Sequence, residues 1–479
     1  MSQLSAHIFK ACDIRGLAGT EITADTAYRI GWAVGVLAKG KLGLEGPRIF
    51  VGGDVRPSTP ELMSAAVDGL LTSGCSVVDL GIVPTPAFYF AIETMGADGG
   101  IMVTASHNPA PFNGFKLRVG RMPITPEEIE EVRRLAETAP STAQRAGTVA
   151  RTDILPAYEE HILSTAPAPK PLSVVVDCSN GCYSEIAPKL LRRLGMQVHE
   201  LFCVPDGTFP GHPPNPAVAS NLNALCRKVE DVGADIGVAF DGDGDRVAFV
   251  DSRGKPVTAD TAAVIFIRHI IPGSAERQEA LPNQQEVINR QSPLKVVYDL
   301  KCSMAVEEAI RQAGCVPIME RSGHTFIKTR MLLEKAVFGA EISGHFFYEK
   351  LWGGDDGLFS ALVMMDLVGR VAPLAEMADS VPAYSITPDL RIPVEGLNVP
   401  EVLERLKSAA EGDVSLLDGL RVVYPEGWAL FRPSVTEPAV TLRFEARCPE
   451  DLRVVIQRFL APTPELREKV FKALEKAVS

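Results

Sequence analysis

The chain has 479 residues, 46% of them hydrophobic, and a formal net charge of -12 at pH 7. This composition excludes general disorder and predicts a globular protein of several domains. The acidic balance argues against nucleic acid as a partner, and no apolar run reaches the roughly 18 residues that span a bilayer. Nine scattered cysteines do not form a disulfide framework in a chain of this size. The first residues carry no export signal, so we expect a cytoplasmic protein without membrane or nucleic-acid partners.

Short apolar strands alternate with amphipathic helices along most of the chain, which is typical of βαβ units around a mostly parallel sheet. One helix is predicted over 59–74, with Thr59 as its N-cap, and another over 125–137 with the same Thr-Pro-Glu start. The segment 35–42 resembles a phosphate-binding P-loop, but Leu42 stands where Ser or Thr is required. It also lies in a helical pattern, so we interpret it as a helix end.

One pattern recurs three times. Apolar strands end in Asp54, Asp177 and Asp299, and each is followed by a helix, a second strand and a further strand with a polar loop. Those loops are TASH at 104–107, DGDGDR at 241–246 and GAEISGH at 339–345. We therefore predict three diverged copies of one α/β unit. Ligands of open α/β sheets lie beyond the carboxyl ends of the strands, so these loops are the expected place for chemistry.

From about Tyr384 the pattern changes to alternating strands followed by terminal helices, which predicts a fourth domain of α+β type. The predicted domains are 1–155 with the serine loop, 156–258 with the aspartate loop, 259–380 with the GAEISGH loop, and 381–479. The polar stretch 276–293 is expected to be an exposed insertion.

The aspartate loop predicts a metal site. Asp241, Asp243 and Asp245 alternate with other residues, so an extended loop would turn all three carboxylates to one side. Three hard oxygen ligands suit Mg²⁺, which takes its remaining ligands from phosphate oxygens and water. Arg246 follows directly and can hold a phosphate oxygen.

The sequence allows three interpretations of Ser106. A hydrolase nucleophile is disfavoured, because the loop lacks a GxSxG elbow and His107 would point away from Ser106 on an extended backbone. A phosphorylated serine fits better, since the metal loop would offset its charge. The third reading is a simple turn at Asn108-Pro109.

Two further loops carry alternating polar groups. Glu341, Ser343 and His345 would form a row on one face of an extended loop, which suits a polyol, although a polar strand end is an equal alternative. In the last domain, the set Arg432, Ser434 and Thr436 has the composition of a phosphate site, with a surface hairpin turn as the alternative.

Together, FKACDIRG (9–16), TASHNP with NGFK (104–109, 113–116), DGDGDR, GAEISGH and RPSVTEP (432–438) resemble the phosphohexomutase superfamily, in the family's order and over almost the whole chain. The bacterial phosphomannomutase/phosphoglucomutase branch is the most similar. The resemblance implies four domains around a central cleft and reversible phosphoryl transfer between O1 and O6 of a hexose phosphate.

The same resemblance implies a role for each site residue. Ser106 would be the phosphoserine and would bind Mg²⁺ together with the three loop aspartates, while hexose 1,6-bisphosphate would act as intermediate and activator. Acid–base and catalytic roles would fall to Arg246, Lys116, His345, His107 and Arg15. Substrate binding would fall to Lys301, His324, Glu341, Ser343, Arg432, Ser434 and Thr436. The expected assembly is a monomer or homodimer.

Two positions depart from the family pattern. Cys12 stands where an aromatic residue is frequent, and Val435 takes a place often held by Asn or Gly. Within the family the alternative is a phosphoglucosamine mutase, against which Ile342 and Val435 argue. Outside it, the alternatives are a metal-dependent sugar phosphatase and an inactive sugar-phosphate-binding homologue.

Overall fold

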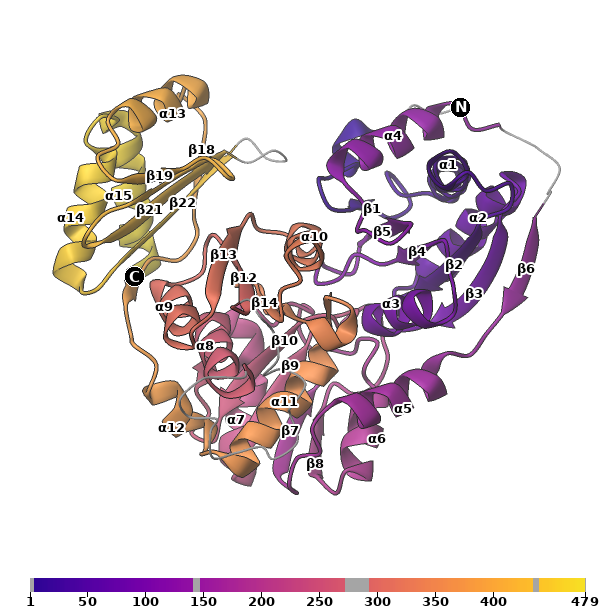
Figure 1. Ribbon diagram of the computed structural model, residues 1–479, viewed down its shortest axis with the longest axis horizontal. Coiled ribbons are helices and arrows are strands. Elements are labelled where there is room, and N and C mark those ends of the chain that lie inside the picture. The colour runs from indigo at the N-terminus through magenta and orange to yellow at the C-terminus, as the bar shows by residue number, and fades with distance from the viewer. Residues whose placement is uncertain (1–3, 141–146, 272–292, 434–438, 479) are drawn as a thin grey trace.

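A computed structural model describes residues 4–140, 147–271, 293–433 and 439–478. The elements form four sheets with their helices, and the chain passes through them in order (Figure 1). The first sheet lies at the upper right of that view and the fourth at the upper left, with the second and third between and below them. No helix in the described ranges is both long and apolar enough to cross a membrane.

The first sheet has six strands in the order β1-β5-β4-β2-β3-β6, and β5 is antiparallel to both of its neighbours. Its elements are the 3-10 helix Ala6–Ile8, β1 (Ile14–Leu17), α1 (Ala24–Leu42), β2 (Arg48–Gly53), α2 (Thr59–Thr72), β3 (Ser76–Ile82), α3 (Thr85–Thr94), β4 (Gly99–Val103), β5 (Phe112–Val119), α4 (Pro126–Glu137) and β6 (Thr148–Arg151).

The second sheet has the order β11-β10-β9-β7-β8 and the third β13-β12-β14-β15-β16. The second unit contains α5 (Leu155–Thr165), β7 (Ser173–Asp177), α6 (Ile186–Arg193), β8 (Gln197–Leu201), the 3-10 helix Ala219–Leu222, α7 (Asn223–Val232), β9 (Ile236–Phe240), β10 (Val247–Asp251) and β11 (Pro256–Val257). After it come α8 (Ala259–Ile270), β12 (Lys295–Asp299), α9 (Met304–Gln312), β13 (Val316–Glu320), α10 (His324–Glu334), β14 (Phe338–Ala340), β15 (Phe346–Tyr348), the 3-10 helix Glu349–Leu351, β16 (Gly354–Asp355), α11 (Gly357–Arg370) and α12 (Leu374–Asp379).

The fourth sheet is antiparallel throughout, with the order β17-β22-β21-β20-β19 and β18 paired to β22. Its elements are β17 (Ser385–Ile386), β18 (Leu390–Pro393), α13 (Val399–Ser408), β19 (Asp413–Ser415), β20 (Leu420–Val423), β21 (Gly427–Pro433), β22 (Ala439–Ala446), α14 (Pro449–Leu460) and α15 (Pro464–Val478). The predicted fold class is confirmed.

The three α/β units share one strand order: β5-β4-β2-β3, β10-β9-β7-β8 and β15-β14-β12-β13. Each also has the same turn at its first central strand. The Oδ1 atoms of Asp54, Asp177 and Asp299 accept the backbone N–H two residues further on, at 3.0, 2.9 and 3.0 Å respectively. A short side chain that bonds the backbone two residues ahead reverses the chain at that point. The predicted threefold repetition is confirmed down to this detail.

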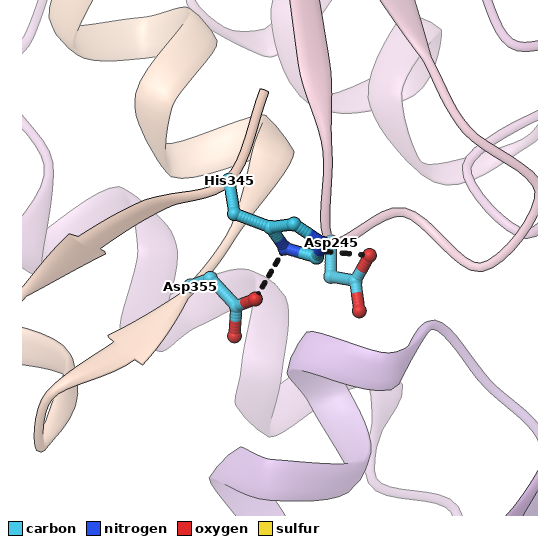
Figure 2. A group of neighbouring side chains, drawn as sticks. All are labelled: Asp245, His345 and Asp355. Atoms are coloured by element: carbon cyan, nitrogen blue, oxygen red, sulfur yellow. Dashed lines mark hydrogen bonds and ion pairs between the residues drawn. The ribbon is translucent and has the colours of Figure 1, made fainter. Parts of the chain in front are cut away.

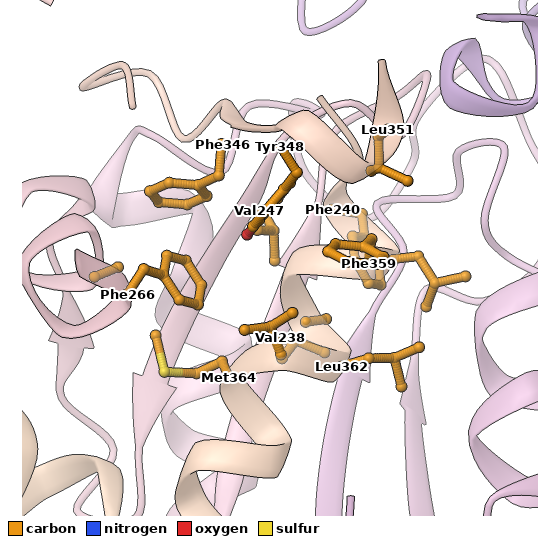
Figure 3. Close-up of a cluster of buried hydrophobic side chains, with 14 of the residues drawn as sticks. Val238, Phe240, Val247, Phe266, Phe346, Tyr348, Leu351, Phe359, Leu362 and Met364 are labelled. Atoms are coloured by element: carbon orange, nitrogen blue, oxygen red, sulfur yellow. The ribbon is translucent and has the colours of Figure 1, made fainter. Parts of the chain in front are cut away.

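One apolar core joins the second and third units and also includes part of the first, with Phe50, Phe88 and Met102. Helix α11 places Phe359, Leu362 and Met364 beside Val238 of β9 and Phe346 of β15 (Figure 3). Phe266 of α8 meets Phe346 edge to face, with ring centroids 4.9 Å apart. The first unit also has a separate core, and the fourth unit has its own. The first three units therefore share one continuous core on which the loops of the cleft rest.

The fourth unit contacts the third through a buried acid. Glu445 of β22 accepts hydrogen bonds from the backbone N–H of Met304 (2.8 Å), the indole of Trp428 (2.6 Å) and the hydroxyl of Ser303. Its carboxylate thus caps the first turn of α9, which belongs to a different unit.

The start of α2 differs from the prediction, whereas the end of α1 agrees with it. Ser58, not Thr59, is the N-cap of α2, and it makes no side-chain cap bond. The hydroxyl of Thr59 instead donates to Asp54 at 2.8 Å, because that carboxylate lies within reach inside the core. The segment 35–42 ends helix α1 as predicted. The domain boundaries stay predictions, and most of 276–293 lies outside the described residues.

Candidate active site

Ser106 lies directly after β4, and its side chain is fully buried. Its hydroxyl donates to Asp241 Oδ2 of the second unit at 2.7 Å, and its backbone N–H donates to Thr104 at 2.8 Å. The serine loop and the aspartate loop follow equivalent strands of two repeated units. Their meeting confirms that the carboxyl ends of these strands face a common site.

The backbone of Ser106 is not extended, because its φ is +49°. As a result, Ser106 Oγ lies 3.4 Å from His107 Nδ1, and the prediction that the two side chains point apart is wrong. A non-glycine residue in the left-handed region is costly and is held there by its surroundings. Burial, Arg246 and Arg15 lower the pKa of His107 well below its ordinary value, so its imidazole is neutral.

A buried arginine anchors the serine loop from below. The side chain of Arg56 forms an ion pair with Asp54 at 3.0 Å and is fully buried. It also donates to four backbone carbonyls, those of Ser106 (2.8 Å), Asn108 (2.6 Å), Pro109 (2.8 Å) and Phe112 (2.9 Å). A guanidinium has five N–H donors in a fixed planar arrangement, and in Arg56 all five are used, one by Asp54 and four by these carbonyls.

Asp241, Asp243 and Asp245 converge as predicted, with carboxylate oxygens within 4.8 Å of one another and all three side chains buried. The loop is bent rather than extended, and Gly244 has φ +85°. Convergence therefore comes from a turn at a glycine and not from strand alternation.

The donor set fits a hard divalent cation. Asp243 Oδ1 and Asp245 Oδ1 are buried without a hydrogen-bond partner, and Ser106 Oγ lies against Asp241. Carboxylate and hydroxyl oxygens are the ligands that Mg²⁺ prefers. Burial, followed by Asp243 and Asp245, raises the pKa of Asp241 well above its ordinary value. A cation would relieve this repulsion.

Lys116 of β5 also faces this cluster. Its ammonium donates to Asp243 at 2.7 Å and also contacts Asp245. Burial lowers the pKa of Lys116, but the two carboxylates raise it by more, so the group is charged. Thr85, the first residue of α3, gives Asp243 a further hydrogen bond at 2.6 Å.

His345 connects the aspartate loop to the third unit. Its Nδ1 lies 2.6 Å from Asp355 and 3.8 Å from Asp245 (Figure 2). Its Nε2 accepts from Arg246 Nε at 2.9 Å, which requires that nitrogen to be unprotonated. The ring proton therefore lies on Nδ1 and is donated to Asp355. Burial lowers the pKa of His345, but Asp245 and Asp355 raise it by more, and this makes Nε2 a stronger base.

A cavity of about 850 Å³ opens above these groups, lined by residues of all four units, including His107, Arg246, Lys301, Glu341 and Ser343. Glu341 and Ser343 do not form the predicted row on an extended loop. Gly344, at φ +92°, makes a tight hairpin turn in which the N–H of Glu341 bonds the carbonyl of His345 at 3.0 Å. Both Glu341 Oε2 and Ser343 Oγ are nevertheless buried without a hydrogen-bond partner, so they are free to bind a ligand.

Among the remaining predicted residues, Lys301 lines this cavity. Arg15 donates to Asn108 of the serine loop at 3.0 Å, and the ring of His324 stacks on that of His345 with centroids 5.9 Å apart. Lys301 pairs with Asp389 at 3.0 Å, and Arg432 of β21 pairs with Asp418 at 2.6 Å. Ser434, Val435 and Thr436 lie outside the described residues.

Cys12 lies at the contact between the first and third units. Burial raises its pKa to about 12, and it is close to Thr325 at the start of α10. It therefore stays a thiol and contributes a small apolar contact where an aromatic side chain is frequent in the family.

Three residues of the site were not predicted. Arg56 follows the strand-ending Asp54 by two positions, and a basic residue there was the available signal. Asp355 lies in GGDDG beside the GAEISGH loop, and Arg443 lies in LRFEA and lines the cavity. The loop carbonyls that Arg56 binds and the partners of Arg443 are distant in the sequence, so spacing alone gives no indication of these pairings.

Comparison with known proteins agrees with this geometry. Family models described as phosphoglucomutase/phosphomannomutase, alpha/beta/alpha domains I, II and III match residues 6–143, 156–254 and 279–384. The chain belongs to the phosphoglucomutase/phosphomannomutase family. A phosphomannomutase/phosphoglucomutase of Pseudomonas aeruginosa is 38% identical over 456 residues, or 94% of each chain. The present chain is therefore also an isomerase of the mutase type.

Other relatives agree. A phosphoglucomutase of Neisseria gonorrhoeae is 37% identical over 96% of this chain and 97% of its own. The crystal structure of a family protein from Burkholderia thailandensis superimposes with a TM-score of 0.85, at 34% identity, and covers 96% of this chain and 99% of that one.

Proposed function

We propose that this mutase moves a phosphoryl group between O1 and O6 of a hexose phosphate, through a phosphoserine at Ser106 and a hexose 1,6-bisphosphate intermediate. The observation that supports this proposal most directly is the 2.7 Å contact between Ser106 Oγ and Asp241 of the carboxylate cluster. A hydroxyl held against a cation site can carry a phosphoryl group whose charge the site offsets.

In the first half-reaction the sugar hydroxyl attacks the phosphorus of phospho-Ser106. A phosphorus–oxygen bond to the sugar forms, and the bond to Ser106 Oγ breaks. In this step Arg246 would turn from His345 Nε2 toward the phosphoryl group, and the freed Nε2 would accept the hydroxyl proton. Lys116 would supply a proton to the departing serine oxygen. The bisphosphate then reorients in the cavity so that its other phosphoryl group faces Ser106. The same steps in reverse transfer that phosphoryl group to Ser106.

Asp241, Asp243, Asp245 and a phosphoserine oxygen would hold Mg²⁺, which when bound would stabilise charge on the transferring phosphoryl group. Arg246 would contact the same group from the cavity side. Hexose 1,6-bisphosphate would activate the enzyme because it can phosphorylate an unmodified Ser106 and leave as a monophosphate.

The unpartnered oxygens of Glu341 and Ser343 support sugar-hydroxyl binding at the mouth of the cavity. Lys301 and His324 would contribute further contacts, and Arg432 with Ser434 and Thr436 would hold the phosphate that is not reacting. Because Ser434 and Thr436 lie outside the described residues, their part in this phosphate site is proposed from the sequence alone.

The test is a ³¹P NMR time course with Mg²⁺, a trace of hexose 1,6-bisphosphate, and mannose 1-phosphate or glucose 1-phosphate in separate samples. We expect a growing 6-phosphate resonance without inorganic phosphate. Inorganic phosphate would instead indicate a phosphatase. An unchanged spectrum in both samples, but turnover of glucosamine 1-phosphate, would indicate a phosphoglucosamine mutase.

Ser106→Ala provides the sharpest variant. It is expected to fold normally and to lose turnover, because no phosphoryl carrier remains. Ser184→Ala is the matched control, since that serine is equally buried but bonds only the carbonyl of Gly181 at 2.8 Å. Near-normal activity of the Ser106 variant would exclude the phosphoserine mechanism.

A further inference from the structure

Three buried side chains form a closed ring beneath the aspartate loop. The hydroxyl oxygens of Tyr158 and Tyr183 lie 2.6 Å apart. Tyr158 is also 2.8 Å from Asp356 Oδ2, and Tyr183 is 2.9 Å from Asp356 Oδ1. The side chains come from α5, from the segment before α6 and from the N-cap of α11. All three residues are at most 3% exposed, so bulk water does not reach them.

The number of protons decides the state of this ring. Three oxygen–oxygen contacts of hydrogen-bonding length require three hydrogens, and each tyrosine supplies one. An ionised carboxylate only accepts, so one contact would bring two oxygens together at 2.9 Å or less with no hydrogen between them. Inside a protein such an unpaired contact is strongly unfavourable. A protonated carboxyl supplies the missing hydrogen.

We propose that Asp356 is a neutral carboxylic acid in the folded enzyme, and that its hydrogen-bonded ring with Tyr158 and Tyr183 positions the Mg²⁺-binding loop. The hydrogen lies on Oδ2, because Oδ1 already accepts the backbone N–H of Phe359 at 3.0 Å. Oδ2 donates to Tyr158, Tyr158 donates to Tyr183, and Tyr183 donates back to Oδ1. Each member then donates once within the ring.

The surroundings of Asp356 favour the neutral form. The titratable groups around Asp356 are Tyr158 and Tyr183 in the ring, Tyr348 from β15, and three groups that line a small cavity with it: Glu93, His161 and Asp355. No salt bridge to Asp356 occurs among the described residues. Burial raises the pKa of Asp356 to about 6 even with both ring hydroxyls donating to it. The backbone N–H groups of Phe359 and Leu358 also act to lower this pKa. Because one of the hydroxyl hydrogens is needed between the two tyrosines, only one ring hydroxyl can solvate an ionised carboxylate, and this favours the neutral form.

The ring touches the aspartate loop at Gly244. A Cβ added to Gly244 would lie 2.6 Å from Cε2 of Tyr183, so the tyrosine ring is pressed against the loop backbone. The N–H of Gly357, next to Asp356, donates to the Gly244 carbonyl at 3.1 Å. Both supports of this turn are thus held by the ring, and a neutral Asp356 adds no further negative charge near the loop carboxylates.

The consequence concerns metal affinity, and here the inference rests on the proposed use of Mg²⁺ at this loop. Residues that orient metal ligands from behind typically change affinity by about 10- to 100-fold when altered. Tyr158→Phe opens the ring without touching Gly244, so we expect Mg²⁺ to bind about tenfold more weakly. Asp356→Asn keeps the ring closed, because its amide N–H donates to Tyr158 and its carbonyl accepts from Tyr183. Its affinity is expected to equal that of the parent protein.

The test combines calorimetric Mg²⁺ titration with infrared difference spectroscopy on the full chain, neither of which depends on turnover. The parent minus Asp356→Asn spectrum at neutral pH is expected to show the C=O stretch of a protonated carboxylic acid. Tyr348→Phe is the control, since that buried tyrosine bonds Ser360 at 3.0 Å and lies outside the ring.

Two results would overturn the proposal. Absence of the carboxylic acid band, with Asp356→Asn binding Mg²⁺ as weakly as Tyr158→Phe, would mean that Asp356 is ionised. A band with unchanged Mg²⁺ affinity in Tyr158→Phe would mean that the ring does not position the loop. If the parent protein binds no Mg²⁺ at all, the proposed function fails, and the band still reports the state of Asp356.

Discussion

Replacement of Arg56 by methionine tests whether the serine loop depends on its anchor. Methionine keeps a long side chain but removes all five side-chain hydrogen bonds of Arg56, one to Asp54 and four to backbone carbonyls. Removing one partner of a buried ion pair costs about 3–5 kcal/mol. Asp54 keeps its bonds from Thr59 (2.8 Å) and Thr104 (2.7 Å), so we expect a loss within this range.

Activity is expected to fall as well. Ser106 would lose the donor to its carbonyl, and a catalytic group displaced by about 1 Å loses roughly 10²-fold in rate. Urea denaturation would report the stability, and turnover per folded molecule would report the position of Ser106. Arg29→Met is the control, because that buried arginine of α1 donates to the Ala136 carbonyl at 2.8 Å, away from the site. Parent-like turnover per folded molecule in Arg56→Met would refute this reasoning.

Three further predictions follow from single contacts. Asp355→Asn is expected to lower kcat about 10²-fold with little change in KM, because His345 loses its charged partner; steady-state kinetics would measure this. Partial burial lowers the pKa of His212, but its bond to the buried Asp177 raises the pKa by more, above the ordinary 6.5. Its stabilisation is therefore present below that value and lost as pH rises, so His212→Asn is expected to lower Tm more at about pH 5.5 than at about pH 8.5. Gly244→Ala is expected to weaken Mg²⁺ binding in calorimetry, whereas Gly233→Ala, also at positive φ but facing open space, is expected not to. Equal Mg²⁺ affinities in the two glycine variants would contradict this account of the loop.

Much of the fold was predictable because its signals are local. Strand-ending aspartates, polar loops after apolar strands and Thr-Pro helix starts each act within a few residues. The convergence of Asp241, Asp243 and Asp245 was predicted for the same reason, although the bend at Gly244 was not. A periodicity argument assumes regular backbone, and glycine at positive φ departs from it.

Side-chain directions in turns and long-range partners could not be predicted. The left-handed backbone of Ser106 brings its hydroxyl toward His107, and this geometry is imposed by tertiary contacts. Arg56 acts through carbonyls about fifty residues away that the folded sheet brings close, and Asp355 reaches His345 across the pairing of β15 with β16. A pattern of residue types does not indicate these pairings, because each partner alone looks like an ordinary surface charge.

The order of elements along the chain has a consequence for synthesis. Each repeated sheet is built from consecutive strands, so each can form as its own segment emerges, and domains generally fold in that order. The second sheet is different in one respect. The helix that covers part of β9 and β10, α11, begins only at Gly357, after the whole third sheet. The aspartate loop is therefore made early but gains the support of α11 late. A nascent chain that stops before residue 357 carries the three loop aspartates, the proposed metal ligands, without the helix that supports their turn.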